Sequence, residues 1–369
     1  GLISCGAPQQ PAPTPIKIGV ITTLTGEYNG NGEATRQSID LAVKEVMAEG
    51  GLLVGNERRP IEIIYADDKN KPEVAVEVAL KLINQDRVIG LIGAPFSSIA
   101  IPVGGVAENA KIPFISSTST NPKTTQGRSY VFRACYTDPF QGEVLANFAN
   151  DSLKLNKAAI LYEQTSEYSQ GLTEFFRQQF IKLGGTIMAN EPYNAGETNW
   201  SKQIAQIKQM NPDFIFLPNA YLDVVSQTLQ LRQAGLNQPL LGGDSWDVDF
   251  NIKYPEFENS YVSLGWHRDV ADDKAKAFIT TFSQMYADDV PSELEANTYD
   301  AINLLFHAIT TAKSTDSKAI RDVLAATKNY HGVTGFISFN GSGDPTKSAV
   351  IVKITDGTSV YYQQVSPQE

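Results

Sequence analysis

Short apolar segments that recur along the chain, with amphipathic stretches between them, limit its possible folds more than any other feature. In the first half they are residues 16–21, 61–65, 88–92 and 112–115; in the second half they are residues 158–162, 186–189, 214–217 and 239–241. Strands that alternate with helices predict parallel sheets covered by helices on both faces. Because the pattern restarts near residue 158, and because 369 residues exceed what one core usually supports, we expect an α/β protein with two such lobes.

The stretches between these strands have helical spacing. Apolar residues recur every four positions after Pro72, and a second helical face, which includes Trp200, ends before Pro212. The last third is mixed, with helical spacing over 278–286 and 297–309 and strand-like segments at 335–341, 348–355 and 359–363. This mixed section predicts that the chain crosses between the lobes more than once.

Charge and hydropathy exclude two classes of partner. The net charge is -11 and the sequence pI is near 4.9, whereas a nucleic-acid surface needs clustered Lys and Arg. No apolar stretch approaches the roughly 20 residues that a membrane helix requires. We therefore expect small molecules or proteins as partners, no nucleic acid, and no span of the bilayer.

The first fifteen residues have the form of an export signal's end and a tether. Leu2-Ile3-Ser4-Cys5 has the pattern of a bacterial lipobox, and the Pro-rich residues 6–15 predict an extended linker. The alternative is an ordinary cysteine near a disordered end. We interpret Cys5 as a lipidation site that anchors the protein outside the membrane, and Cys135 as a small buried hydrophobe, without a structural disulfide.

Neutral polar side chains follow two neighbouring strands of the first half. Ser97 lies in "GAPFSS" after the third strand, and Thr118 and Thr120 lie in "PFISSTSTNPK" after the fourth. In parallel α/β sheets, ligands bind outside the carboxyl ends of the strands. These hydroxyls and amides are suited to a carboxylate, although Ser, Thr, Asn and Pro are also the residues of a surface turn.

The corresponding strand ends of the second half carry aromatic and acidic residues. They are Tyr168 in "TSEYSQG", Tyr221 in "PNAYLD" and Asp244 in "GGDSWD". An acid with aromatic rings is suited to an ammonium group, so a ligand with both charges would bridge the two halves. The alternatives are exposed turn aromatics for the two tyrosines and helix capping for Asp244.

Several motifs, in order along residues 16 to 355, resemble one family: "IGVITTLTGEYNGNGEA", "YADDKNKPEVAVEVALKLI", "IGLIGAPFSS", "IPFISSTSTNP", "VFRACYTDPFQG", "ILYEQTSEYSQG" and "NTYDAINLLFHAI". The chain is similar to type I periplasmic solute-binding proteins of ABC importers, specifically the leucine/isoleucine/valine-binding branch. The resemblance implies two Rossmann-like lobes with parallel central sheets, joined by a multi-strand hinge. We expect residues 16–137 with 268–332 to form the first lobe and residues 138–267 with 333–369 to form the second.

The resemblance also implies roles for individual residues. Ser97, Thr118 and Thr120 match positions that hold the ligand's α-carboxylate and α-ammonium, and Tyr168 and Tyr221 match aromatics that close over the ligand. Asp244 stands where the branched-chain proteins have a glutamate that pairs with the α-ammonium.

Other positions depart from the family pattern. Asn31 replaces an aromatic that contacts the ligand's side chain, with Tyr28 three residues earlier, and residues 67–70 and Phe96 stand where some relatives have a disulfide. Tyr28, Phe96 and Trp246 are candidates for the side-chain pocket, with a core position as the alternative.

The sequence offers no catalytic or cofactor motif. The loop at Gly30 lacks the third glycine of a dinucleotide fingerprint, the three histidines have no metal-ligand spacing, and residues 67–70 lack the glycine and glutamate of a calcium loop. There is also no G-x-S-x-G elbow. We therefore expect neither an enzyme, nor a cofactor, nor a metal site.

Together these features predict a monomeric, extracytoplasmic lipoprotein in the periplasm or on the outer face of the cytoplasmic membrane. It would capture a free amino acid by hinge closure and deliver it to an ABC permease. Two alternatives remain open: a urea- or short-amide-binding protein of the same fold, and a ligand-sensing module that signals to a receptor.

Overall fold

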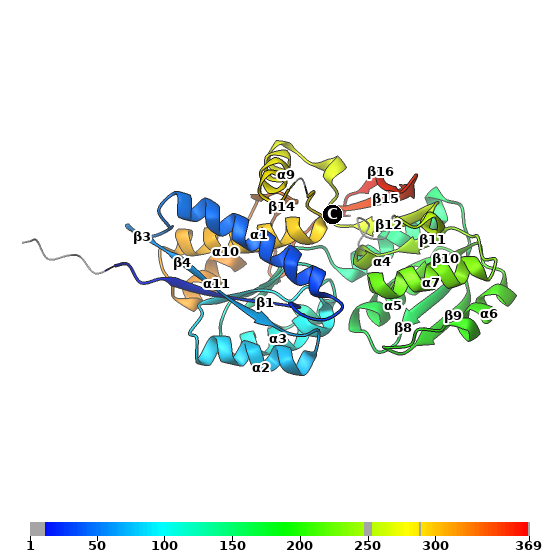
Figure 1. Ribbon diagram of the computed structural model, residues 1–369, viewed down its shortest axis with the longest axis horizontal. Coiled ribbons are helices and arrows are strands. Elements are labelled where there is room, and N and C mark those ends of the chain that lie inside the picture. Colours follow the sequence, from blue (N-terminus) through cyan, green and yellow to red (C-terminus); the bar gives the residue numbers. More distant parts are fainter. Residues whose placement is uncertain (1–11, 247–252, 288, 368–369) are drawn as a thin grey trace, which may run out of the picture.

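Two separate sheets with mainly parallel strands organise the computed structural model, which describes residues 12–246, 253–287 and 289–367. Each sheet forms the centre of one lobe, and the lobes lie side by side along the long axis (Figure 1). The prediction of a two-lobed α/β fold is confirmed. Cys5 and residues 1–11 of the predicted tether lie outside the described residues.

The first sheet has five parallel strands. In spatial order they are β4 (Ile61–Asp67), β1 (Ile16–Thr22), β5 (Gly90–Gly93), β6 (Phe114–Ser116) and β7 (Val131–Arg133). β1 is apolar on both faces because helices cover both sides of the sheet, and all but one of its residues are buried. β7 was missed in the sequence, since three residues are too short for a periodic signal.

Helices cover both faces of the first sheet. One face packs against α1 (Asn29–Ala48), α10 (Glu293–Ala312) and α11 (Ser317–Ala325), and the other against α2 (Pro72–Asn84) and α3 (Ser97–Ala110). Pro72 begins α2 at the position where a missing N–H costs nothing. α9 (Asp273–Met285) packs against α1, and two hairpins, β2 (Leu52–Val54) with β3 (Glu57–Arg59) and β13 (Tyr330–Gly332) with β14 (Gly335–Ile337), complete this lobe.

The second sheet has seven strands. In spatial order they are β16 (Thr358–Val365), β15 (Ala349–Thr355), β12 (Ser260–Leu264), β11 (Leu240–Gly242), β10 (Phe214–Leu217), β8 (Lys157–Glu163) and β9 (Thr186–Tyr193). The five from β12 to β9 are parallel, and β15 and β16 are antiparallel additions. α6 (Ser201–Met210) and α7 (Tyr221–Gln233) cover one face, and α4 (Asp138–Asn147) and α5 (Glu167–Lys182) the other.

The chain passes between the lobes at three places. It leaves the first sheet after β7, returns after β12 to form α9, α10 and α11, and leaves again between β14 and β15. Ile337 and Phe339 still pack in the core of the first lobe. The predicted return between the lobes is therefore present, while the proposed boundary at residue 333 stays a prediction.

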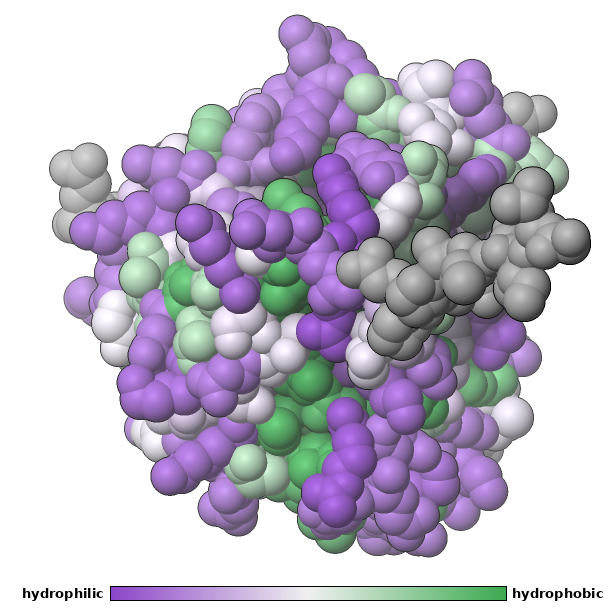
Figure 2. Space-filling model, turned by 90° about the vertical axis from the view of Figure 1, so that its left-hand side faces the viewer, coloured by the Kyte–Doolittle hydropathy of each residue, from purple (hydrophilic) through white to green (hydrophobic). Residues whose placement is uncertain are grey.

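One face of the molecule is mostly polar (Figure 2). The free end of the first lobe is largely hydrophilic, with a narrow apolar strip (Figure 2). No helix in the described part of the chain is long and apolar enough to cross a membrane. Cys135 is a buried free thiol, in the core position that the sequence indicated.

Candidate functional site

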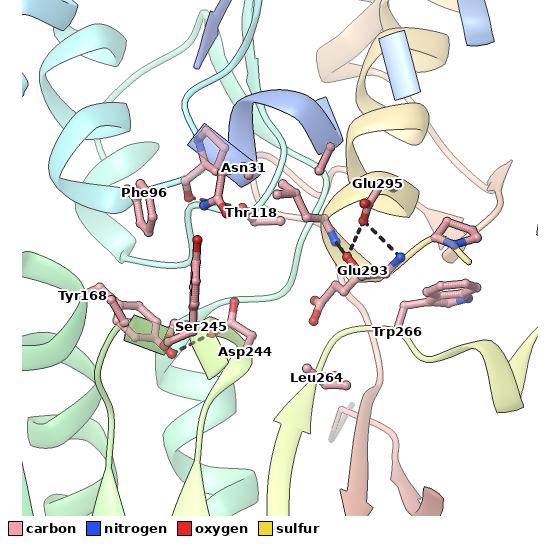
Figure 3. Close-up of a pocket in the computed structure, with 18 of the residues that line it drawn as sticks. Asn31, Phe96, Thr118, Tyr168, Asp244, Ser245, Leu264, Trp266, Glu293 and Glu295 are labelled. Atoms are coloured by element: carbon pink, nitrogen blue, oxygen red, sulfur yellow. Dashed lines mark hydrogen bonds between the residues drawn. The ribbon is translucent and has the colours of Figure 1, made fainter. Parts of the chain in front are cut away.

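The strand orders of the two sheets place a cavity between the lobes. In each sheet, the strand that comes first in the chain lies between the next two strands of that sheet. β4 and β5 flank β1 in the first lobe, and β9 and β10 flank β8 in the second. Connections diverge at such switch points, and ligands bind outside the strand ends there. A cavity of about 420 Å³ lies at this place, within the size range of small-molecule sites (Figure 3).

Several helices begin at the cavity. Its walls include Asn29, Ser97, Tyr221 and Glu293, the first residues of α1, α3, α7 and α10, and Ser166, the N-cap of α5. The first N–H groups of a helix have no partner within the helix, and the helix dipole is positive at that end. Backbone amides from both lobes can therefore face a negatively charged group in the cavity.

Neutral hydroxyls form the part of the first lobe's wall that follows β5 and β6. Ser97 Oγ accepts hydrogen bonds from Ser119 Oγ at 3.1 Å and from the Asn121 backbone N–H at 3.4 Å, so its own proton is left for another acceptor. Thr118 also lines the cavity, and its hydroxyl donates to the Pro95 carbonyl at 3.2 Å. Thr120 differs from the prediction, because it is fully buried behind the loop and does not line the cavity.

Arg133 supports this wall from behind. Its guanidinium is completely buried and donates to the carbonyls of Ser119 at 2.6 Å and Asn121 at 2.9 Å. It also donates to Thr125 Oγ1 at 2.8 Å and pairs with Asp344 at 2.6 Å. The rigid, five-donor guanidinium therefore fixes the backbone of the loop that carries Thr118.

The wall of the second lobe is centred on Asp244. Its Oδ1 accepts hydrogen bonds from the Tyr168 hydroxyl at 2.8 Å and from Gln141 Nε2 at 3.0 Å. A Cβ at Gly243 would lie 2.4 Å from the Tyr168 hydroxyl, so glycine is needed for this close approach. Burial raises the pKa of Asp244 to about 6 despite these bonds.

A second carboxyl beneath Asp244 is held neutral at pH 7. Asp138 is fully buried, and desolvation together with the charge of Asp244 raises its pKa to about 8. One of its oxygens accepts from Gln141 at 3.2 Å, and the other has no hydrogen-bond partner. At neutral pH the negative charge of this pair therefore lies on Asp244.

Aromatic rings from both lobes meet at one end of the cavity. Phe96 and Tyr221 line it, and Tyr28 packs edge-on against both, with ring centroids 5.3 Å and 5.5 Å away. Tyr28 is not itself a lining residue, so it supports the two rings from behind. Because Tyr28 and Phe96 belong to the first lobe and Tyr221 to the second, this cluster spans the gap between the lobes.

Trp246 is not a pocket residue, contrary to the prediction. Its side chain is fully buried in the core of the second lobe, where the indole N–H donates to the Leu217 carbonyl at 2.8 Å and the ring packs edge-on against Phe257. The core alternative therefore holds for Trp246. Trp266, which follows β12, lines the cavity instead.

Glu293 is a lining residue that the sequence analysis did not find. Its Oε1 accepts from the Gly265 backbone N–H at 2.8 Å and, more weakly, from Asn297 at 3.4 Å. Burial and the charge of Asp244 raise its pKa well above the ordinary value. In the sequence, Glu293 lies inside the capping box of Ser292 and Glu295, and a glutamate in a first helical turn is ordinary.

The lobes also touch at the rim of the cleft. Asn121 Nδ2 donates to the Glu167 carbonyl at 2.9 Å, and Lys123 Nζ lies 3.0 Å from the Glu167 carboxylate. Both contacts join the loop after β6 to the start of α5. Among the residues described, no group of three or more His, Cys, Asp or Glu is placed to hold a metal ion.

Comparisons with known proteins agree with this architecture. A family model described as "Periplasmic binding protein" matches residues 15–358. A Leu/Ile/Val-binding protein homolog of Brucella abortus is 28% identical over 359 residues, which cover 95% of this chain and 94% of the relative. The regions matched by the family model and by this relative therefore include both lobes.

Two solved structures have the same fold over nearly the whole chain. A leucine-binding protein from Thermotoga maritima is 29% identical, with a TM-score of 0.90, and covers 95% of this chain and 99% of its own. A branched-chain amino acid transporter substrate-binding protein from Streptococcus pneumoniae, in complex with isoleucine, is 28% identical, with a TM-score of 0.88, and covers 96% and 100%. A Rhodopseudomonas palustris protein in complex with benzoate, at 21% identity, shares the fold with a TM-score of 0.85.

Proposed function

The chain belongs to the periplasmic binding protein family, and from this premise we propose that it binds a free α-amino acid between its lobes. The observation that carries the proposal is the opposition of the two cavity walls. Ser97 and the start of α3, beside Thr118, offer neutral donors for an α-carboxylate, and Asp244 faces them with a buried acid for an α-ammonium. A buried zwitterion is costly unless both charges are paired, and these walls pair both.

Closure of the lobes is the mechanism that this arrangement favours. The ligand's carboxylate binds the first lobe, and the contacts with Tyr168, Tyr221 and Asp244 form only when the second lobe approaches. A ligand shifts such an equilibrium by its differential affinity for the closed form. The edge-on packing of Tyr28 against Tyr221 and the rim contacts with Glu167 also stabilise the closed form.

We further propose that the protein delivers its ligand unchanged to an ABC permease and is anchored outside the cytoplasmic membrane through Cys5 as a monomer. The family membership and the lipobox-like residues 2–5 support this proposal. Mass spectrometry of the membrane-associated protein tests the anchor: a diacylglyceryl adduct on Cys5 supports it, and an unmodified Cys5 contradicts it. Loss of amino-acid uptake on deletion supports transport, whereas intact uptake favours a sensing module.

Isothermal titration calorimetry with the twenty amino acids, urea and short amides tests the ligand class. We expect saturable binding of at least one α-amino acid and none of its analogue without the α-ammonium group. Binding of urea or an amide alone would replace the proposal with the amide-binding alternative. Recovery of chemically unchanged ligand after incubation tests the absence of catalysis.

A further inference from the structure

We propose that Glu293 selects the ligand's side chain, and that the amino acid this protein prefers carries an N–H donor at the end of that side chain. This inference rests on the proposed binding of an α-amino acid and specifies its class. The ligand is then an amide or basic amino acid, in contrast to the aliphatic ligands in the names of the relatives described above.

Glu293 is buried in the wall of the cavity, at a place that a ligand's side chain could reach. The residue is only 8% exposed, and it lines the same cavity as Asp244. Figure 3 shows the two carboxyl groups reaching into one space, Glu293 from the start of α10 and Asp244 from beyond the end of β11. If Asp244 binds the α-ammonium, Glu293 lies further along the cavity, beside Leu264 and Trp266, where a side chain would extend.

The hydrogen bonds of Glu293 are incomplete. Its Oε1 accepts from Gly265, whereas its Oε2 is buried and has no hydrogen-bond partner. Buried polar atoms almost always have a partner, so an orphaned carboxyl oxygen in the wall of a binding cavity indicates a partner from the ligand. An aliphatic side chain could not supply one, and it would leave Oε2 both desolvated and unpaired.

Lys347, a cation that acts on Glu293, is already committed to other groups. Lys347 is buried near Glu293, but its ammonium donates to the Ala134 carbonyl and to Thr334 Oγ1, and Asp300 is the first charge that acts on it. No ion pair between Lys347 and Glu293 occurs in residues 12–246, 253–287 and 289–367. Lys347 therefore does not satisfy Oε2.

The charge of the cavity also favours a ligand whose side chain carries an N–H donor. Among its described lining residues, five are acidic and one, Arg268, is basic; the acidic ones are Glu27, Asp244, Asp289, Glu293 and Glu295. Like charges at Asp244 and Glu293 disfavour ionisation of both. A neutral Glu293 can exchange two hydrogen bonds with a side-chain amide, and an ionised one can pair with an ammonium or guanidinium.

Matched ligand pairs test the proposal on the wild-type protein. Asparagine and leucine have nearly the same shape, norleucine is lysine without its terminal ammonium group, and the members of each pair differ in the N–H donor. We expect asparagine to bind at least tenfold more tightly than leucine, or lysine at least tenfold more tightly than norleucine, by calorimetry. If the apolar member binds as tightly in both pairs, the inference about Glu293 is wrong while the amino-acid function stands. If none of the four and no other amino acid binds, the proposed function itself fails.

Two variants separate the amide from the cation. Glu293→Met removes the acceptor and should reduce the preference for the donor ligand to less than threefold. Glu293→Gln keeps an acceptor and should retain asparagine binding but weaken lysine binding at least tenfold. An unchanged preference in Glu293→Met would overturn the proposal. Glu73→Met and Glu73→Gln are the matched controls, because Glu73 also lies in a first helical turn but is exposed on α2, and they should leave every affinity unchanged.

Discussion

The two walls of the cavity reach complementary chemistry by different means. Around Ser97 and Thr118, the wall of the first lobe is polar through hydroxyls and helix-end amides, and a buried arginine holds the neighbouring loop. The other wall holds Asp244 of the second lobe and, beside it, Glu293 from the start of α10 on the first lobe, and burial raises the pKa of both acids. One wall therefore binds an anion without titrating near neutral pH, whereas the other can gain or lose a proton.

Binding at the first wall therefore depends on accurate geometry, whereas binding at the second depends on the charge of its acids. A wall built from neutral donors must be placed accurately, because each hydrogen bond depends on geometry. A wall built from a buried carboxylate attracts a cation over a longer range, but its charge depends on pH and on its neighbours. Variants on the first wall should therefore act through positioning, and variants on the second through charge.

The largest expected effect comes from the scaffold of the first wall. Arg133→Met should lower the free energy of unfolding by about 3 to 5 kcal/mol, because it removes the buried cation that pairs with Asp344 and donates to the carbonyls of Ser119 and Asn121. Urea unfolding followed by circular dichroism measures this change. Arg177→Met, at a surface ion pair on α5, is the control and should change stability by less than about 0.5 kcal/mol. A similarly small change for Arg133 would contradict its structural role.

On the second wall, Asp244→Asn should weaken amino-acid binding by about 2 to 5 kcal/mol, because a buried ammonium loses its counter-charge. The amide can still accept the hydrogen bond from Tyr168, so packing is preserved. Since burial raises the pKa of Asp244, its ionised form is disfavoured in the ligand-free fold, and the variant should melt no lower than the wild type at pH 7. Calorimetry and thermal unfolding test both parts; an affinity within threefold of wild type would exclude the pairing.

The same carboxyl should make binding depend on pH. With the pKa of Asp244 at about 6, the group is ionised at pH 7 and protonated at pH 5. Below pH 6 the affinity for an amino acid should fall about tenfold, or about 1.4 kcal/mol, per pH unit. The stability of the ligand-free protein should change in the opposite direction, since a raised acid pKa means that the folded state binds more protons between pH 4 and 6. Asp244→Asn should remove most of the pH slope of binding, and a slope that persists in this variant would assign the titration to another group.

A single neutral donor of the first wall should contribute less. Ser97→Ala removes one hydrogen bond to the ligand's carboxylate and should weaken binding by about 1.5 kcal/mol, because the backbone amides at the start of α3 remain. Unlike the loss at Asp244, this loss should be the same at pH 5 and pH 7. Calorimetry at the two pH values measures it, and Ser201→Ala, at the exposed first residue of α6 and outside the cavity lining, is the matched control. A loss that varied with pH would contradict the division between the walls.

The sequence predicts most of the fold and part of the cavity's lining. β1, β4, β8 and β10 have continuous apolar runs that local pattern reveals, whereas β7 and β12 were not found, since β7 is three residues long and the polar serines of β12 weaken its apolar pattern. The residues that directly follow strands, such as Ser97, Tyr221 and Asp244, line the cavity because strand ends share one edge, and their contacts with a ligand stay a prediction.

Residues that reach the cavity by a long return of the chain were not predictable in this way. Glu293 begins a helix that packs on the first lobe, yet it contacts Gly265 beyond a strand of the second sheet. Trp246 and Trp266 are equally plausible aromatics in the sequence; both are buried in hydrophobic clusters, but tertiary packing brings only Trp266 to the cavity. The sequence around Arg133 does not distinguish it from a surface charge, and only the tertiary structure shows that it is buried and supports a loop.

The smallest expected effect concerns the rim contact that joins the two walls. Lys123 and Glu167 lie 3.0 Å apart, with side chains 61% and 41% exposed, so the ion pair should contribute only about 0.2 to 1 kcal/mol to the closed form. Lys123→Met should weaken binding by that amount, mainly through faster dissociation of the ligand, since closure holds the ligand in place. The Asn121 contact uses the Glu167 carbonyl and survives the substitution. Stopped-flow measurements at low and high salt test this, because screening should remove the difference between variant and wild type. A difference that grows with salt would show that Lys123 acts through something other than charge.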